Sequence, residues 1–415
     1  MRELGIGIIG CGVVGTEVIR CLREDRELWA RRWGVAPVVR RVAVRDLSRC
    51  RAIPLAAGVL TQDVDGLLSD PSIDVVVEVT GRVEEAKLWL ERALESGKHV
   101  VTANKALLAR HLVELQELAR KHDRTLGYEA AVAGGVPLLR AVREGLVAYG
   151  ISEIVGVLNG TTHYILSRMA IEHLSFQSAL SEAQRLGFAE PDPSDDVSGR
   201  DAACKLAILA QVALALPVTL REIFFEGVES VLPVDLQLAS KLGFSIKPVA
   251  VARRAAVEGK WELRVHPALV PAATPMGRLE FEENGIRVST EQRGDYFFSG
   301  RGAGGPPTAG AVVSDLLEVA LRPGASPRVS LADVAFTVPS EQFVTGHYLR
   351  VSGDASAVRR TLDSRDIRVL ASVQQGDESA LVTSRGTAAS VLSPLASSGA
   401  EPPRAWLRVE GELPS

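Results

Sequence analysis

The fold of this chain is decided by residues 4–15, which read LGIGIIGCGVVG. An apolar run with the character of a strand ends at Gly10 and a helical pattern follows, and in this context the spacing G-x-G-x-x-G predicts a dinucleotide site. Glycines let the backbone approach a pyrophosphate, and the N–H groups and dipole at the helix N-terminus stabilise its charge. A chance glycine turn is the alternative, but the flanking strand and helix argue against it. We therefore expect cofactor contacts at all six residues of the turn, namely Gly10, Cys11, Gly12, Val13, Val14 and Gly15.

Outward from this turn, apolar strands alternate with amphipathic helices, which is typical of parallel strands joined by crossover helices. Strands are expected over residues 4–9, 38–44, 73–79, 99–103 and 125–128, and helices over 84–96 and 106–122. The predicted fold class is therefore α/β, with a Rossmann-type doubly wound parallel sheet in a dinucleotide-binding domain of residues 1–134. A glycine-rich turn at 300–305 precedes a helical pattern over 308–321, and we expect residues from about 308 to 340 to complete this domain.

The remainder of the chain predicts two further domains. Residues 135–307 mix long helices (162–173, 175–187 and 199–216) with strands (261–265 and 285–290), which is typical of an α+β catalytic or dimerisation domain. Residues 345–415 have the order strand, helix, strand, strand, helix, strand, over 348–351, 355–362, 367–373, 379–383, 388–396 and 405–409. That order predicts a ferredoxin-like domain.

The composition excludes several classes of partner. The formal net charge of the 415 residues is -4, which gives no basic field to attract nucleic acid. The longest nearly uncharged run, 206–220, is shorter than the roughly 20 residues of a membrane-spanning helix, and the N-terminus has no signal-peptide pattern. The cysteines have neither metal-ligand nor secreted-disulfide spacing, and they are Cys11, Cys21, Cys50 and Cys204. We therefore expect a cytoplasmic protein with reduced thiols, a small-molecule ligand, and no nucleic-acid or membrane partner.

Asp201 and Lys205 are four residues apart on one expected helix, so their side chains share a face. A solvated surface pair is the alternative, and such a pair is worth only about 0.3 to 0.5 kcal/mol. Lys205 is, however, the only charged residue between Ala202 and Leu220, and burying an unpaired ammonium costs several kcal/mol. A lysine in that setting indicates a polar site, where a lowered pKa would suit proton transfer.

Three other stretches carry polar side chains in places that suit a ligand. The loop 187–196 holds four carboxylates and two prolines and suits an ammonium-bearing substrate, a solvated turn being the alternative. Lys105 follows the fourth strand at the edge where α/β sheets bind ligands, although a lysine at a helix start is an equal alternative. Asp46 could accept a free ribose 2′-hydroxyl and Arg45 could pair with a 2′-phosphate, so the choice between NAD and NADP stays open; Arg45 comes first, which favours NADP.

Together these stretches resemble the homoserine dehydrogenase family, and the motifs occur in family order from Gly7 to about Asp315. The block 187–209, GFAEPDPSDDVSGRDAACKLAIL, carries the strongest likeness. VGVLNGTTHYIL at 155–166, YEAAVAGG at 128–135, and GAGG at 302–305 with Pro307 and Thr308 also look like that family.

The resemblance implies the reversible NAD(P)-dependent reduction of L-aspartate 4-semialdehyde to L-homoserine, in the biosynthesis of threonine, methionine and isoleucine. Hydride would pass between the nicotinamide and C4 of the aldehyde. Lys205 would be the proton donor or acceptor, with Asp201 beside it, and Lys105 would be a second lysine at the carbonyl. Glu190 and Asp196 would hold the amino group of the substrate.

The same resemblance implies further ligand contacts. The substrate would also be bound by Gly160 and Thr161. Cofactor contacts beyond the glycine turn would be Arg45, Thr80, Gly81, Asn104, Lys105 and Gly302. A monovalent cation, Na⁺ or K⁺, would be bound by a side-chain oxygen of Glu129 and the backbone carbonyls of Val132 and Gly134, since oxygen ligands suit a hard cation.

The sequence also departs from the family. Phe188 stands where Tyr is frequent, so a hydroxyl contact to the substrate is absent, and His163 stands where Asn is usual and is expected to form local hydrogen bonds. The C-terminal domain resembles ACT domains in element order, but its first loop, 352–358, lacks their Asp-x-Pro-Gly pattern, which puts threonine feedback in doubt. Such a domain would bind an amino-acid effector or serve dimerisation. No aspartokinase domain precedes the first motif, so we expect a monofunctional enzyme that forms a homodimer or higher homo-oligomer.

Two other functions compete with this interpretation. A nucleotide-sensing regulatory protein would need no proton relay, so the lysine and carboxylate set argues against it. An enzyme acting on another aldehyde or keto acid would be separated by a panel of substrates. Aspartate semialdehyde dehydrogenase would need a nucleophilic cysteine, whereas Cys11 lies in the phosphate turn and Cys204 in a helix.

Overall fold

The computed structural model describes residues 2–49, 52–324, 337–397 and 401–414, and the chain forms two compact units. Unit 1 comprises Met1–Val147, Ala207–Leu220 and Arg301–Ala332. Unit 2 comprises Ala148–Leu206, Arg221–Gly300 and Asp333–Ser415. Cys50, and residues 325–336 of the segment expected to complete the first domain, lie outside the described residues.

Unit 1 contains a parallel sheet with the strand order β3-β2-β1-β4-β5-β6, which confirms the predicted Rossmann-type sheet. The strands are β1 (Arg2–Ile9), β2 (Val35–Ala43), β3 (Leu60–Thr61), β4 (Val75–Glu78), β5 (His99–Thr102) and β6 (Leu126–Gly127). The helices are α1 (Val13–Glu24), α2 (Arg26–Trp33), α3 (Val64–Ser69), α4 (Glu84–Glu95), α5 (Lys105–Lys121), α6 (Leu138–Arg140) and α12 (Gly305–Leu321). The sequence did not predict β3, because a two-residue strand carries no periodic pattern.

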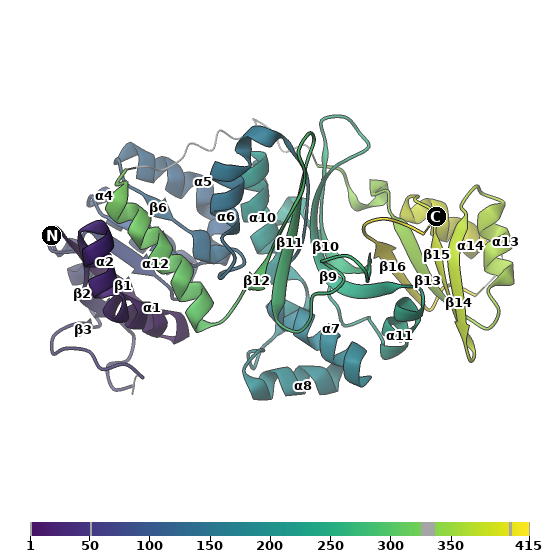
Figure 1. Cartoon of the computed structure of the whole chain (residues 1–415), viewed down its shortest axis with the longest axis horizontal. Helices are drawn as coiled ribbons and strands as arrows, with labels where there is room; N and C mark the ends of the chain where they lie inside the picture. The colour runs from purple at the N-terminus through teal and green to yellow at the C-terminus, as the bar shows by residue number, and fades with distance from the viewer. Residues whose placement is uncertain (1, 50–51, 325–336, 398–400, 415) are drawn as a thin grey trace. The chain divides into compact units, whose positions relative to one another are not determined.

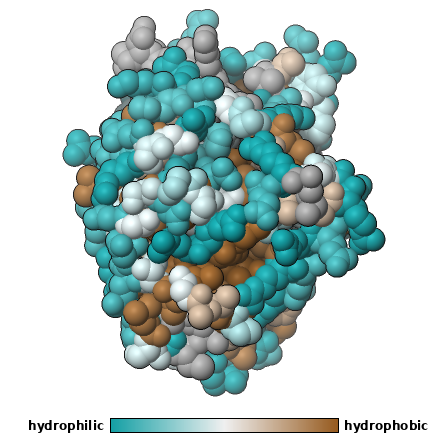
Figure 2. Space-filling view, turned by 90° about the vertical axis from the view of Figure 1, so that its left-hand side faces the viewer, coloured by the Kyte–Doolittle hydropathy of each residue, from teal (hydrophilic) through white to brown (hydrophobic). Residues whose placement is uncertain are grey.

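The core of unit 1 joins segments that are far apart in the sequence. Leu4, Ile6 and Ile8 of β1 are fully buried and belong to one cluster with Val312 and Leu316 of α12. Figure 1 shows α12, in green, beside the purple α1, which it contacts. Full burial of each such side chain contributes about 1.5–3 kcal/mol, so α12 is held in unit 1 by apolar packing. Figure 2 shows a mostly hydrophilic surface, with hydrophobic side chains visible in a hollow near the centre of the view.

Unit 2 is built on a mixed sheet with the strand order β12-β11-β7-β9-β10-β16-β13-β15-β14, and β8 also pairs with β10. The strands are β7 (Ile151–Val157), β8 (Phe224–Phe225), β9 (Phe244–Arg254), β10 (Trp261–Pro271), β11 (Glu283–Thr290), β12 (Gly294–Arg301), β13 (Gly346–Ser352), β14 (Val369–Gln375), β15 (Glu378–Thr383) and β16 (Ala405–Val409). Its helices are α7 (Gly160–Glu172), α8 (Phe176–Leu186), α9 (Ser194–Val197), α11 (Pro233–Lys241), α13 (Ser356–Asp363) and α14 (Ala388–Ser397), and α10 (Arg200–Leu214) begins here.

The sequence analysis missed β9 and predicted only part of its neighbour β10. β9 was not predicted, and β10 was predicted only over 261–265, because prolines normally exclude a central strand. In the structure, Pro248 of β9 and Pro267 of β10 lie directly opposite each other in the antiparallel pair. Both strands are buried along most of their length, so they lack the alternating pattern of a half-exposed strand.

The C-terminal segment has the predicted element order, strand, helix, strand, strand, helix, strand. Its sheet continues into the rest of unit 2, because β16 pairs in parallel with β10 at Ala268 and Leu269. The residue after β16, Glu410, is buried, and its carboxylate accepts from Arg264 Nη2 at 2.7 Å and from Arg253 Nη2 at 2.8 Å. Burial alone would raise the pKa of Glu410, but these two guanidinium groups hold it well below its usual range. None of the helices in the described parts of the chain is long and apolar enough to cross a membrane.

Candidate active site

The glycine turn after β1 leaves the N-terminus of α1 accessible to a ligand. A Cβ at Gly15 would lie 2.2 Å from the carbonyl oxygen of Gly10, so only glycine permits this close contact between helix and turn. Gly10 has a φ of 105°, a conformation that favours glycine. A Cβ at Gly12, the N-cap of α1, would meet no described atom within 4 Å. The turn therefore offers backbone N–H groups and open space together.

A second helix N-terminus lies beside the first. α12 begins at Gly305, and no described side chain caps its N-terminus at Gly304. A Cβ at Gly305 would lie 3.0 Å from Val13 Cγ1, so the first turns of α12 and α1 are in contact. Each helix dipole places partial positive charge at its N-terminus, and the two ends together favour an anion such as a pyrophosphate.

A buried carboxylate, Glu78, joins the turns that follow β4 and β5. Its Oε1 accepts the N–H and the hydroxyl of Thr80, both at 2.7 Å, and its Oε2 accepts the hydroxyl of Thr102 at 2.7 Å. Asn104 caps α5 by accepting the N–H of Leu107 at 3.1 Å. The predicted residues Thr80 and Asn104 are therefore fixed at the carboxyl edge of the sheet. Sequence reasoning missed Glu78, whose signal is a charge at the end of an apolar strand.

The other residues predicted to contact cofactor in unit 1 also follow strands. Lys105 is the first residue of α5 and is exposed, and Gly81 has a φ of 74° in the turn after β4. Arg45 is exposed beyond the end of β2. The carboxylate of Asp46 accepts the N–H and the hydroxyl of Ser48 at 2.8 and 2.6 Å. Asp46 is thus engaged within its own turn.

Glu129, the predicted side-chain ligand of a cation, is buried and capped by backbone groups. Its Oε1 accepts the N–H of Leu139 at 3.0 Å and its Oε2 accepts the N–H of Arg140 at 2.9 Å. Its own N–H donates to Asp315 at 2.9 Å. Burial raises the pKa of Glu129, and it raises that of Asp315 to about 7. Each carboxylate oxygen has two lone pairs, so the backbone contacts leave Glu129 able to accept a further ligand.

The loop after Glu129 meets the glycine-rich segment before α12. Ala133 has a φ of 51°, and a Cβ at Gly134 would lie 3.1 Å from both Gly302 O and Thr308 Oγ1. The predicted residues Gly134 and Gly302 are therefore in close proximity. No group of three or more His, Cys, Asp or Glu in the described ranges could hold a metal ion, so a cation at this loop would depend on backbone oxygens.

In unit 2, α10 holds the predicted lysine and aspartate on one face. Lys205 Nζ lies 2.8 Å from Asp201 Oδ2 and donates to Leu158 O at 2.6 Å. Lys205 is 7% exposed and Asp201 is 4% exposed. The two side chains therefore meet, as their four-residue spacing predicted, and the ammonium group is buried and paired.

Asn159 connects this pair to α7, and sequence reasoning assigned it no role. As the N-cap of α7, its Oδ1 accepts the N–H of Thr162 at 2.8 Å. Its Nδ2 donates to Asp196 Oδ1 at 2.6 Å and to Asp201 Oδ2 at 2.7 Å. One buried amide thus brings Asp196, Asp201 and the start of α7 together. The sequence signal was an Asn directly before a helix, which is a preferred N-cap.

The acidic loop between α8 and α9 lies next to the start of α7. Thr161 Oγ1 donates to Phe188 O at 2.8 Å, and Gln184 Nε2 donates to Glu190 O at 3.2 Å. The Glu190 side chain is exposed. A Cβ at Gly160 would lie 3.1 Å from a backbone oxygen of the neighbouring loop, which explains the glycine. The structure therefore places Gly160, Thr161 and the backbone of Glu190 near one another.

His163 has the local hydrogen bonds that the sequence suggested. It is fully buried, its Nδ1 lies 2.9 Å from Glu283 O, and its Nε2 lies 3.2 Å from Lys247 Nζ. A carbonyl only accepts, so Nδ1 carries the proton and Nε2 accepts from the lysine. Burial lowers the pKa of His163 to about 3. An imidazole that is neutral and forms hydrogen bonds through both ring nitrogens has a structural role.

Two family models match the chain. The model described as "Homoserine dehydrogenase, NAD binding domain" matches residues 10–129, and the one described as "Homoserine dehydrogenase" matches residues 137–317. A homoserine dehydrogenase of Bacillus subtilis is 39% identical over 319 residues, which are 77% of this chain and 73% of that protein.

Solved structures give the same result. A homoserine dehydrogenase from Thiobacillus denitrificans is 36% identical, has a TM-score of 0.90 and is covered over 99% of both chains. A hyperthermophilic archaeal homoserine dehydrogenase in complex with NADPH is 25% identical, with a TM-score of 0.66, over 77% of this chain and 98% of that one.

Proposed function

The chain belongs to the homoserine dehydrogenase family, and we propose that Lys205 exchanges the proton with the reacting oxygen in its reaction. The protein is an NAD(P)-dependent oxidoreductase that interconverts L-aspartate 4-semialdehyde and L-homoserine, a step toward threonine, methionine and isoleucine. The observation that carries the proposal is the buried pair of Lys205 and Asp201, with Nζ and Oδ2 2.8 Å apart. A buried ammonium group whose orientation is fixed by its hydrogen bonds is suited to proton transfer.

The protein groups divide the chemistry as follows. The nicotinamide cofactor supplies or accepts the hydride. Lys205 donates a proton to the carbonyl oxygen as the aldehyde is reduced, and takes it back from the hydroxyl in the reverse direction. Asp201 is a positioning residue, because its carboxylate binds Nζ, and Leu158 O fixes a second N–H of the ammonium. Lys105, at the start of α5, is proposed as the second lysine at the carbonyl.

Carboxylates beside this lysine suit the amino group of the substrate. We propose that Glu190 and Asp196 bind it, with Gly160 and Thr161 at the same end of α7. The orientation of Asp196 supports this role, because Asn159 Nδ2 donates a hydrogen bond to Asp196 Oδ1 at 2.6 Å. The side chain of Glu190 is exposed and can turn toward a ligand.

The cofactor is proposed to bind at the two helix N-termini of unit 1. The glycine turn, with no atom near a Cβ at Gly12, fits a pyrophosphate. NADP is proposed over NAD because Asp46 is engaged by Ser48, whereas Arg45 is exposed and can pair with a 2′-phosphate. The test is a fluorescence titration of Arg45→Ala, which should weaken NADPH binding about 10-fold and leave NADH binding within about twofold. Equal losses for both cofactors would contradict the preference.

A monovalent cation is proposed at Glu129, Val132 and Gly134. The donor set fits, because the carboxylate of Glu129 retains lone pairs and the other two ligands would be carbonyls. Such an ion would neutralise the buried carboxylate, whose pKa burial raises. It takes no part in the proton transfer proposed above.

We propose three domains for the chain: 1–134 with about 308–340, 135–307, and an ACT-like domain at 345–415. The element order and the sheet order β16-β13-β15-β14 support the last of these. A homodimer or higher oligomer is proposed as well, and light scattering of the purified chain tests it.

The reaction is tested by following NADPH or NADH absorbance with aspartate semialdehyde. The wild type should turn over, and Lys205→Ala should lose about 10² to 10⁴ in kcat, the usual value of a positioned acid-base group. Lys241→Ala, which changes an exposed lysine on α11, is the matched control and should retain activity. If the wild type bound cofactor but reacted with neither the aldehyde nor homoserine, a sensor or another substrate would become the better interpretation.

A further inference from the structure

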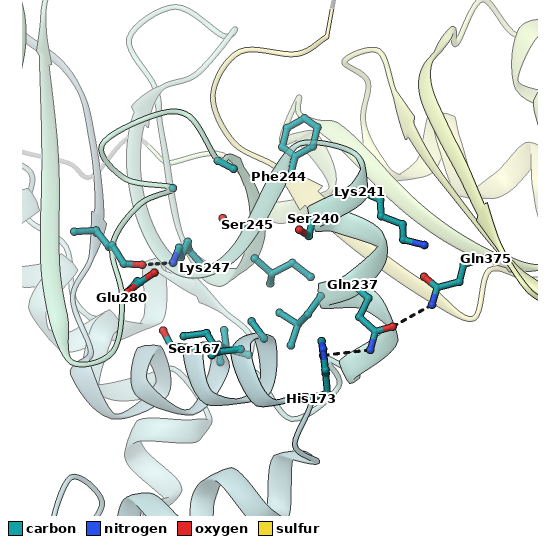
Figure 3. Close-up of a pocket in the computed structure, with 18 residues that line it drawn as sticks. Ser167, His173, Gln237, Ser240, Lys241, Phe244, Ser245, Lys247, Glu280 and Gln375 are labelled. Atoms are coloured by element: carbon teal, nitrogen blue, oxygen red, sulfur yellow. Dashed lines mark hydrogen bonds between the residues drawn. The ribbon is translucent and has the colours of Figure 1, made fainter.

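Unit 2 contains a cavity of about 620 Å³ that none of the proposed catalytic or substrate residues lines. Its walls come from α7, α11, the start of β9, the loop after β10 and Gln375 at the end of β14. Sites for small molecules measure about 300–1,000 Å³, so this cavity is large enough for one. Figure 3 shows Lys247 and Glu280 on one side of it and Gln375 on the other.

The cavity wall contains a buried cation, Lys247, which is 7% exposed. Its Nζ donates to Leu279 O and to Nε2 of the neutral His163, so two of its three N–H groups are bound. Lys247 forms no ion pair with any described residue, and Glu280 and Glu283 act on it only at longer range. Burial lowers the pKa of Lys247 to about 8, which leaves the amine mostly charged at pH 7.

A buried ammonium group without a carboxylate in contact is costly, and an anionic ligand in the adjacent cavity would offset that cost. The remaining N–H can form a charge-assisted hydrogen bond to a carboxylate. The rest of the lining combines apolar side chains, including Leu166, Leu236, Phe244 and Ile246, with polar ones such as Ser240 and Gln237. A carboxylate therefore suits Lys247, and an apolar body on the same molecule would pack against the four apolar side chains.

We propose that this cavity is a second binding site, which takes a small carboxylate with an apolar body and alters the reaction through α7. An amino acid and a simple organic acid share this chemistry. Glu280 distinguishes them, since it lies near Lys247 and would bind the ammonium group of an amino acid.

α7 connects the cavity with the active site. Leu166, Ser167 and Ala170 of this helix line the cavity, and His163, one turn nearer its start, accepts a hydrogen bond from Lys247. The same helix is capped by Asn159, which binds both aspartates of the catalytic cluster. A ligand that binds Lys247 therefore acts on α7, the helix whose N-cap positions Asp196 and Asp201.

The cavity also contacts the C-terminal segment. Gln375 Nε2 donates to Gln237 Oε1 at 3.2 Å, and Gln237 Nε2 lies 3.3 Å from His173 Nδ1. This chain of contacts, drawn in Figure 3, links β14, α11 and the end of α7. The C-terminal segment can therefore respond to the same ligand.

The experiment uses the full chain and three probes with one phenyl body: phenylacetate, L-phenylalanine and phenethylamine. Calorimetry should give saturable binding of the two carboxylates and none of the amine. Lys247→Met, which keeps an unbranched side chain one atom shorter, should weaken carboxylate binding about 10-fold or more. Lys121→Met, at an exposed lysine of α5 outside the cavity, should change it by less than about twofold. Tighter binding of phenylalanine than of phenylacetate would identify the amino acid as the ligand class, and the reverse would identify a simple acid.

Ala170→Trp is a second variant that tests the site even if Lys247→Met fails to fold. Ala170 is exposed on α7 and lines the cavity, so an indole there should fill the space and abolish binding. Failure of both carboxylates to bind the wild type, or equal binding by the two variants and the wild type, would overturn the site. Calorimetry does not depend on turnover, so this outcome is separate from that of the activity experiments.

Transmission along α7 rests on the proposed reaction and has its own readout. Saturating carboxylate should change kcat/KM for aspartate semialdehyde at least twofold in the wild type, and this change should be lost in Lys247→Met. Binding that leaves kcat and KM unchanged would refute transmission and retain the site.

Discussion

Replacement of Asn159 by Ser tests whether this side chain organises the cluster formed by Asp196, Asp201 and Lys205. Serine is also a preferred N-cap, so Asn159→Ser should keep the cap of α7 and remove the amide that donates to Asp196 and Asp201. A hydrogen bond to a charged group contributes about 1.5–3 kcal/mol. Water can replace the bond to the partly exposed Asp196, whereas Asp201 is 4% exposed. We therefore expect a loss of about 2–3 kcal/mol, most of it from Asp201.

Two assays measure the consequences. The thermal midpoint of unfolding should fall by about 5–10 °C, given about 2–4 °C per kcal/mol for a unit of this size. Asn159→Ala removes the cap as well and should cost about 1 kcal/mol more. Because Asp201 positions Lys205, kcat should fall at least about 10-fold, and KM should rise because Asn159 also orients Asp196, the proposed partner of the substrate amino group.

The two variants together show whether Asn159 binds the two aspartates to an effect on stability and turnover, or only caps α7. If Asn159→Ser matched the wild type in midpoint and in kcat while Asn159→Ala did not, the amide would be only a helix cap. Asn159 would then have no role in holding Asp196 and Asp201 beside Lys205.

Three further predictions follow from the packing and from one shifted pKa. Gly15→Ala should destabilise the protein and abolish NADPH binding, because its Cβ would lie 2.2 Å from Gly10 O; thermal unfolding and a fluorescence titration measure both effects. Glu410→Gln should lower the free energy of unfolding in urea by about 1.5–3 kcal/mol, because it removes a buried carboxylate that pairs with both Arg264 and Arg253. His163 has a folded pKa of about 3, so the unfolded chain gains its proton first as pH falls below about 6.5. Stability should therefore fall from pH 6.5 toward 3, by up to about 1.4 kcal/mol per pH unit from this group, and His163→Gln should flatten that slope.

Each of these has a matched control. Gly12→Ala places a Cβ in open space and should weaken NADPH binding without lowering the unfolding midpoint. Glu412→Gln changes an exposed carboxylate two residues from the buried one and should be neutral. His173→Gln changes an exposed imidazole and should leave the pH slope intact. Equal effects of a variant and its control would contradict the corresponding argument.

Local patterns in the sequence were sufficient for the Rossmann-type sheet and for the pairing of Lys205 with Asp201. A strand followed by a glycine turn and a helix is set by neighbours along the chain, and so is the meeting of residues four apart on one helix. The order of elements in the C-terminal segment came from the same kind of pattern. Each of these depends on periods of two or 3.6 residues, which a single sequence displays.

Long-range contacts came only from the tertiary structure. Glu78 joins two turns from different strands, Asn159 joins a helix start to two distant aspartates, and the pairing of β16 with β10 merges two expected domains into one sheet. The cavity beside Lys247 likewise needs walls from several separate segments. No local period encodes such meetings, because they depend on which faces pack once the chain has folded. The sequence therefore determined the Rossmann-type sheet and the pair formed by Lys205 and Asp201. The packing of distant segments decided what holds that lysine in place and which segments enclose the cavity beside Lys247.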